Sequence, residues 1–202
     1  MRNSEREIET PRGPAAVRIT EPAGHAVSLL VLGHGAGGGV DAPDLAALHD
    51  AAVAASVLVA LVTQPYRVAG RRAPAPAAQL DEAWTAVLRQ LGVPDLPLIV
   101  GGRSSGARVA CRTATALGAA GVLCLAFPLH PPGKPEKTRV AELPADLPTL
   151  VLNGDRDPFG VPAPTRNVHV EVRPNATHDL RKDVKTTATL AITWLRAHHW
   201  AT

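Results

Sequence analysis

Aromatic residues, cysteines and long apolar runs are all scarce in this chain of 202 residues. No apolar run approaches the roughly 20 residues that a membrane-spanning helix needs, so we expect no membrane association. The first seven residues mix charges without an apolar stretch, which argues against a signal peptide. Cys111 and Cys124 lie in apolar segments, as reduced core cysteines do, and they favour a cytoplasmic protein.

Two classes of motif are also missing. The chain has no C-x-x-C pair and no H-E-x-x-H sequence, so we expect no metal site. The net charge is +3, and no basic patch is interleaved with aromatic residues. The sequence therefore gives no indication of nucleic-acid binding.

Apolar runs suited to strands alternate with segments of helical spacing along most of the chain. This alternation predicts an α/β fold with a mainly parallel sheet and helices on both faces. We expect a tail over residues 1–14 and one domain over residues 15–202. The expected strands are 15–20 and 26–33 as an opening hairpin, then 57–63, 96–102, 121–127, 147–153 and 167–172. The expected helices are 44–55, 77–91, 105–117 and 179–199.

The most informative motif follows the apolar run 96–102. It is a G-x-S-x-G sequence centred on Ser104, with Gly102 and Gly106 at the flanking positions that must be small. A strand–serine–helix turn of this kind presents a reactive hydroxyl on a strained corner. Ser105 is the poorer candidate, because Arg103 and Ala107 occupy its flanking positions. A glycine-rich loop with an incidental serine is the alternative interpretation.

A glycine-rich loop, 34–39, comes directly after the strand expected at 26–33. Acyl transfer needs backbone N–H groups that face the developing oxyanion. We expect the N–H groups of Ala36 and Ser105 to supply them, with the Gly37 N–H as a substitute.

The same glycine-rich loop formally matches the G-x-G-x-x-G sequence of dinucleotide-binding proteins, through Gly33, Gly35 and Gly38. Such a site would need an acidic residue at the end of the next strand. That strand ends in Thr63-Gln64, with no carboxylate. The dinucleotide interpretation is therefore disfavoured.

Candidates for an acid and a base follow the last two expected strands. Asp155 and Asp157 compete for the role of the acid, and Asp157 lies farther past the strand end, where a loop can bend it toward a histidine. Asp155 suits a turn-forming role. His178 precedes the closing helix, and His130 is the other histidine expected at a carboxyl strand end. The order Ser104, Asp157, His178 is that of one hydrolase architecture.

These motifs resemble the α/β-hydrolase superfamily from about residue 15 onward. The segments 127–136 and 155–160 are similar to the branch around testis-expressed protein thirty and its bacterial relatives, near the dienelactone-hydrolase-like enzymes. The resemblance implies an α/β-hydrolase fold with a minimal lid, with Ser104 as nucleophile, Asp157 as acid and His178 as base. True dienelactone hydrolases use a cysteine nucleophile, so their substrate is not carried over.

We therefore predict a serine hydrolase that cleaves a small ester or thioester through an acyl-enzyme and needs no cofactor. Two alternatives stay open: an acyltransferase with the same triad, and a non-catalytic interaction protein that retains the fold. The sequence does not fix the oligomeric state or the natural substrate. The candidate substrate-binding residues are His34, Gly37, Arg67, Arg71, Arg72 and His130.

Overall fold

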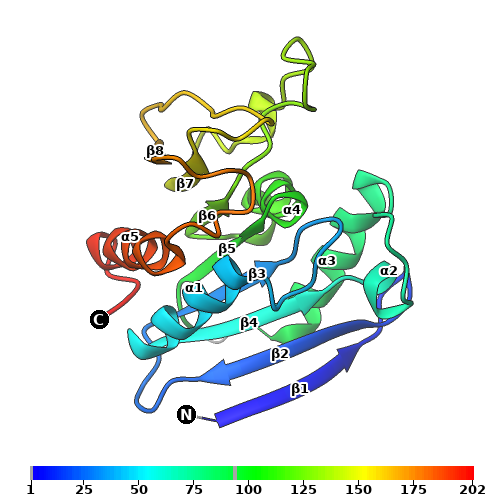
Figure 1. Cartoon of the computed structure of the whole chain (residues 1–202). Coiled ribbons are helices and arrows are strands. Elements are labelled where there is room, and N and C mark those ends of the chain that lie inside the picture. The colour runs from blue at the N-terminus through cyan, green and yellow to red at the C-terminus, as the bar shows by residue number, and fades with distance from the viewer. Residues whose placement is uncertain (1, 93–94) are drawn as a thin grey trace.

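The centre of the protein is a twisted sheet (Figure 1). The computed structural model describes residues 2–92 and 95–202, and within them the strand order is β1-β2-β4-β3-β5-β6-β7-β8. Strands β1 and β2 are antiparallel to their neighbours, and the pairs from β4 to β8 are parallel. The strands are β1 (Arg2–Ile8), β2 (Ala15–Glu21), β3 (Ser28–Gly33), β4 (Val57–Thr63), β5 (Leu98–Arg103), β6 (Gly121–Leu125), β7 (Thr149–Gly154) and β8 (Val168–Arg173).

Helices cover both faces of this sheet (Figure 1). The packing groups α1 and α5 with one set of core residues and α3 and α4 with the other. The α/β fold class expected from the sequence is confirmed. No described helix has both the length and the apolar character needed to cross a membrane. The helices are α1 (Pro43–Ala54), α2 (Pro65–Val68), α3 (Ala77–Leu91), α4 (Ser105–Thr113) and α5 (Val184–Ala197), with short 3-10 turns at Thr115–Leu117 and Val140–Glu142.

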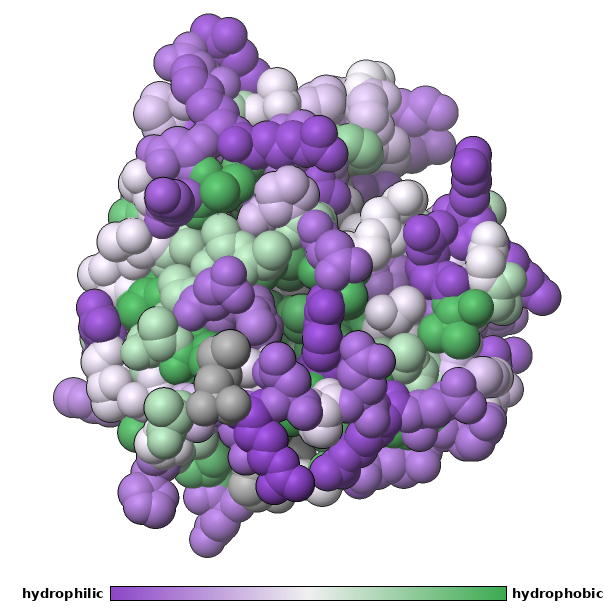
Figure 2. Space-filling view, turned by 60° about the horizontal axis from the view of Figure 1, so that its bottom comes forward, coloured by the Kyte–Doolittle hydropathy of each residue, from purple (hydrophilic) through white to green (hydrophobic). Residues whose placement is uncertain are grey.

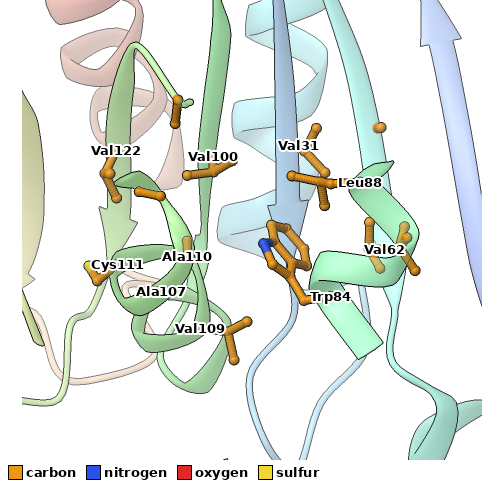
Figure 3. Packing of buried hydrophobic residues seen from close by; sticks show 14 of the residues in the cluster. Val31, Val62, Trp84, Leu88, Val100, Ala107, Val109, Ala110, Cys111 and Val122 are labelled. Atoms are coloured by element: carbon orange, nitrogen blue, oxygen red, sulfur yellow. The ribbon is translucent and has the colours of Figure 1, made fainter. Parts of the chain in front are cut away.

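The core under α3 and α4 is built around Trp84, which is 1% exposed. Figure 3 shows its indole between α3 and the strands, near Val31 of β3. Small residues of α4, including Ala107 and Ala110, face the same layer and let the helix lie close to the sheet. Outside this core, hydrophilic side chains cover much of the face seen in Figure 2, with hydrophobic residues visible between them.

The expected opening hairpin of β2 with β3 is wrong. Strand β2 pairs with β1 and β4, and β3 lies between β4 and β5. All six residues of β3 are buried, as expected of a strand covered on both faces, whereas β2 exposes Ala16 and Glu21. The chain after Pro22 therefore crosses β4 to reach the middle of the sheet.

The N-terminal segment also differs from the expected tail. Residues Arg2–Ile8 form β1, which pairs along its whole length with β2. Its side chains are mostly polar and exposed, and Ile8 alone is buried. Because a two-sided polar strand has no apolar alternation, the sequence pattern gave no strand signal here. Met1 lies outside the described residues.

The closing helix starts later than expected. Its first residue is Val184, and Asp183, in a left-handed conformation at φ 65°, caps it by accepting a hydrogen bond from the Thr186 N–H. The preceding segment is a mostly exposed loop, whose two buried residues, Ala176 and Leu180, pack on the α1 and α5 side of the core. This loop is what carries His178 to the carboxyl edge of the sheet.

Candidate active site

Ser104 lies on the turn between β5 and α4. Its backbone has φ 53° and ψ −109°, a combination that is costly for a residue with a side chain. The turn is held by a 2.9 Å hydrogen bond from the Ser104 N–H to the carbonyl oxygen of Leu125. The strain therefore falls on the serine that the sequence motif singled out.

Steric contacts explain why glycine occupies both flanking positions of the motif. A Cβ added to Gly102 would lie 2.4 Å from the carbonyl oxygen of Gly33, and one added to Gly106 would lie at the same distance from that atom. Gly102 also has φ 154°, a conformation that favours glycine. The β5–α4 turn thus packs against the end of β3, and only glycine fits at both positions.

Three side chains from separate loops form one hydrogen-bonded chain. The His178 Nε2 atom lies 2.8 Å from Ser104 Oγ, and Nδ1 lies 2.8 Å from Asp157 Oδ2. An ionised carboxylate only accepts hydrogen bonds, so Nδ1 carries the proton and Nε2 is left to accept the serine O–H. The Phe159 ring lies against the imidazole, with centroids 4.2 Å apart. The structure therefore brings together all three residues that the sequence order selected.

The Asp157 carboxylate is fully buried and is oriented by its own loop. Its Oδ1 atom accepts a 2.8 Å hydrogen bond from the Phe159 N–H, and Oδ2 accepts one of 3.3 Å from Asn153 Nδ2. Asp155, by contrast, is exposed and uses its backbone N–H to bond Arg173. The two aspartates thus have different environments, since only the Asp157 carboxylate lies next to His178.

Asn153 is a functional residue that the sequence analysis missed. It is completely buried at the end of β7, and its amide bonds both the N–H and the carbonyl oxygen of Phe127. The same Nδ2 reaches Asp157 and the carbonyl oxygen of Gly160. Asn153 therefore holds the loop 155–160, which carries Asp157 and is called the acid loop below, to the segment that follows β6. The available signal was an amide at the end of an apolar strand, just before the candidate acid.

The backbone N–H groups of Ala36 and Ser105 are the oxyanion donors that the sequence analysis expects. Ser105 is the first residue of α4, so its N–H has no acceptor within the helix. Among the backbone hydrogen bonds of the described residues, none is donated by Ala36. The Ala36 carbonyl oxygen accepts a 2.8 Å hydrogen bond from the Tyr66 hydroxyl, which fixes the orientation of the loop.

His34 lies in the wall of the site rather than at its rim, which differs from the expected contact with substrate. It is 2% exposed, and its Nε2 accepts a 3.1 Å hydrogen bond from the Gln64 N–H. Its Nδ1–H donates to the Gly35 carbonyl oxygen at 2.8 Å. Burial lowers the pKa of His34, and the nearby Arg67 charge acts in the same direction. The neutral ring therefore ties the glycine-rich loop to the end of β4.

The other candidate substrate-binding residues lie in exposed or half-buried positions. Arg71 and Arg72 are exposed, and Arg67 donates a 3.2 Å hydrogen bond to the Arg71 carbonyl oxygen. Gly37 is exposed in the glycine-rich loop. His130 packs against the acid loop, where its Nε2 would lie 2.5 Å from a Cβ added to Gly160. The structure thus keeps His130 next to the triad but outside the hydrogen-bonded chain.

A serine on a strained strand-to-helix turn, with an imidazole partner at the carboxyl edge of a parallel sheet, is the arrangement of α/β hydrolases. A family model described as an alpha/beta hydrolase domain matches residues 26–201, and the chain belongs to this family. A search of curated proteins finds no match.

Solved structures agree with this fold. A lidless α/β serine hydrolase from Xanthomonas campestris is 18% identical with a TM-score of 0.79, covering 100% of this chain and 97% of its own. An α/β serine hydrolase homologue from Coxiella burnetii is 19% identical at 0.77, covering 98% of each chain. Dienelactone hydrolase from Anabaena variabilis is 17% identical at 0.74, covering 97% of each. At these identities the likeness is one of fold.

Proposed function

We propose that the protein is a serine hydrolase that cleaves a small ester or thioester through an acyl-enzyme. The observation that carries this proposal is the unbroken chain of two 2.8 Å hydrogen bonds from Ser104 through His178 to Asp157. A protein that only bound partners would not need a strained serine and a buried carboxylate aligned on one imidazole. Esterases among the structural neighbours of the fold are consistent with this chemistry.

The first step is the transfer of the Ser104 proton to His178 Nε2 as Oγ attacks the carbonyl carbon of the substrate. The imidazole becomes a cation, and the buried Asp157 carboxylate stabilises that charge through Nδ1–H. The hydrogen bonds from Phe159 and Asn153 keep the carboxylate aimed at the ring. The acid therefore acts from a fixed position rather than from a mobile loop.

The negative charge that develops on the carbonyl oxygen needs donors that are already in place. We assign this role to the N–H groups of Ala36 and Ser105. The imidazolium then gives its proton to the leaving alcohol or thiol. Water attacks the acyl-enzyme with His178 again as base, which releases the acid and restores Ser104.

A small acyl group suits the surroundings of the serine. The insert 128–148, where a lid would stand in larger hydrolases, contains only the 3-10 turn Val140–Glu142. That turn is fastened to α4, because Glu142 pairs with Arg108 and Arg112. The insert therefore forms no helical cap that could enclose a long acyl chain.

The direct test is labelling with a fluorophosphonate, which forms a covalent bond with an activated serine. We expect the wild-type protein and Ser105→Ala to be labelled on Ser104, because Ser105 contributes its backbone N–H and not its hydroxyl. Ser104→Ala should stay folded and should lose both labelling and hydrolysis of p-nitrophenyl acetate. The burst of p-nitrophenol and the mass of an acetyl adduct would show the intermediate.

Other outcomes would separate the alternatives. A folded wild-type protein that neither reacts with the probe nor hydrolyses short esters would overturn the proposal in favour of a non-catalytic interaction protein. Label found on another residue would assign the role of nucleophile to that residue. If an added alcohol or amine raised the turnover and captured the acyl group in place of water, the protein would be an acyltransferase.

A further inference from the structure

We propose that Arg103, held by Asp44, positions the catalytic histidine, an inference that rests on the proposed function and adds two residues to its machinery. Arg103 occupies the variable position directly before Ser104 in the serine motif. Its side chain leaves the β5–α4 turn and reaches the loop that carries His178. Neither residue is part of the hydrogen-bonded chain from Ser104 to Asp157.

The Arg103 guanidinium lies next to three separate parts of the chain and donates hydrogen bonds to two of them. Arg103 Nε donates to Asp44 Oδ2 at 2.9 Å, and Nη2 donates to the carbonyl oxygen of His178 at 3.1 Å. The third nitrogen, Nη1, would lie 2.9 Å from a Cβ added to Gly35. The same side chain therefore borders the first turn of α1, the β8–α5 loop and the glycine-rich loop that carries Ala36.

Asp44 is built to hold that guanidinium. Its side chain is fully buried, and the Arg103 side chain is 16% exposed. The remaining oxygen, Oδ1, accepts a 3.0 Å hydrogen bond from the Leu45 N–H in the first turn of α1. Burial raises the pKa of Asp44, and the charge of Arg103 opposes that rise. A buried carboxylate with one cationic partner keeps that partner in a single orientation.

The His178 main chain depends on this contact. No backbone hydrogen bond among the described residues ends on the His178 carbonyl oxygen, so the one from Arg103 is its hydrogen-bond partner there. The imidazole ring is held separately by Asp157 and by Phe159. Arg103 thus fixes the backbone to which the ring is attached, while Asp157 fixes the rotation of the ring.

The proposed reaction depends on the position of the His178 ring relative to Ser104. Proton transfer from Ser104 needs the 2.8 Å separation between Nε2 and Oγ, and a shift of about 1 Å in such a geometry lowers rates by up to about a hundredfold. The Arg103–His178 contact joins two protein groups, so we expect it to contribute little to substrate binding. A loosened loop should therefore lower kcat and leave KM nearly unchanged.

The test compares Arg103→Gln, Arg103→Lys and Asp44→Asn with a matched control, Arg108→Gln. Arg108, on α4, is half-buried and ion-paired like Arg103, but it bonds Glu142 rather than an active-site loop. We expect kcat for p-nitrophenyl acetate to fall about tenfold to a hundredfold in Arg103→Gln and Asp44→Asn. Arg103→Lys should retain an intermediate kcat, because an ammonium can pair with Asp44 but cannot bond the carbonyl oxygen at the same time.

Two further measurements make the test specific. The double variant Asp44→Asn with Arg103→Gln should lose no more kcat than the worse single variant, since both substitutions break the same link. The downfield proton resonance of the His178–Asp157 hydrogen bond should weaken in the Arg103 variants and not in Arg108→Gln. Fluorophosphonate labelling should slow in parallel with kcat. If Arg103→Gln does not fold, Arg103→Lys and Asp44→Asn carry the same comparison.

Three results would overturn the inference while leaving the proposed function intact. The first is wild-type kcat and labelling in folded Arg103→Gln. The second is an equal loss of kcat in Arg108→Gln, which would indicate general stability. The third is a rise in KM for p-nitrophenyl hemisuccinate but not for the neutral acetate, which would make Arg103 a binder of anionic substrates. Failure of the proposed function shows differently, as a wild-type protein without labelling or turnover.

Discussion

The Tyr66 hydroxyl donates a 2.8 Å hydrogen bond to the carbonyl oxygen of Ala36, the residue whose N–H we propose as an oxyanion donor. The carbonyl of Ala36 is thus held by the protein, while no backbone hydrogen bond among the described residues is donated by its N–H. Burial raises the pKa of Tyr66, so the hydroxyl keeps its proton and stays a donor across the neutral range.

Tyr66→Phe should therefore lower kcat for short esters about fivefold to tenfold with little change in KM. The substitution leaves the ring in place and removes only the bond that orients the Ala36 peptide, so the oxyanion donor loses alignment. Steady-state kinetics, with thermal unfolding as a check of the fold, would measure this. A rise in KM at constant kcat would instead place Tyr66 in substrate binding.

Asp157→Asn should lower kcat by about three to four orders of magnitude, because an amide cannot hold the Nδ1–H tautomer or stabilise the imidazolium. Asp155→Asn is the matched control and should stay within about 0.5 kcal/mol of wild-type stability with normal kcat, since the Asp155 side chain is exposed. Near-normal turnover in Asp157→Asn, together with loss in Asp155→Asn, would reverse the assignment.

Gly102→Ala should destabilise the protein by about 3 kcal/mol or prevent its folding, and any folded fraction should lack activity. The added Cβ would lie 2.4 Å from the Gly33 carbonyl oxygen, and the backbone conformation at φ 154° disfavours a side chain. Gly24→Ala is the control, because a Cβ there meets nothing within 4 Å. Urea unfolding of both variants would give the difference in unfolding free energy. Equal values would contradict the close packing of the β5–α4 turn.

Glu142 should contribute stability that depends on pH. Burial alone would raise its pKa, but the hydrogen bonds and charges of Arg108 and Arg112 outweigh burial, so the pKa is lowered. Because the folded state holds the proton more weakly than the unfolded chain, the contribution is present above the usual value near 4.5 and is lost as the pH falls through the lowered one.

Glu142→Gln should consequently cost about 1 to 2 kcal/mol of unfolding free energy at pH 7, a range that allows for the partial exposure of the pair. The difference from wild type should shrink when unfolding is measured below pH 4. Glu136→Gln, at an exposed position of the same insert, should show no such dependence. A Glu142 effect that stays constant with pH would mean that packing rather than charge stabilises the insert.

The alternation of strands and helices and the Ser104 turn could be predicted from sequence because both are encoded locally. Periodic apolar residues mark each element, and the flanking glycines mark the turn. The pairing of β2 could not be predicted in this way, since the choice between β3 and β4 as neighbour is decided by burial across the whole sheet. Strand β3 follows β2 in the sequence, but it is not the neighbour of β2 in the sheet.

The supporting residues of the site were harder to predict than the triad. Asn153 and Tyr66 act on the triad and the glycine-rich loop through tertiary hydrogen bonds, and neither belongs to a motif of fixed spacing. His34 shows the converse case: its position at the start of the glycine-rich loop made it a candidate for substrate binding, but its burial was not visible in the sequence. Because the His34 ring is buried, its two nitrogens form hydrogen bonds with the protein backbone.

Strand β1 is the edge strand of the sheet, and its composition discourages a strand of a neighbouring molecule from pairing with it. Its unpaired edge carries the alternating charges of Arg2, Glu5, Arg6 and Glu7, all exposed. Side chains of this kind discourage another strand from adding to a sheet. Without β1, the edge strand would be β2, and the backbone N–H and C=O groups that now pair with β1 would be open to another strand. Strand β1 thus favours solubility of the monomer, at the opposite end of the strand order from the loops that carry Asp157 and His178.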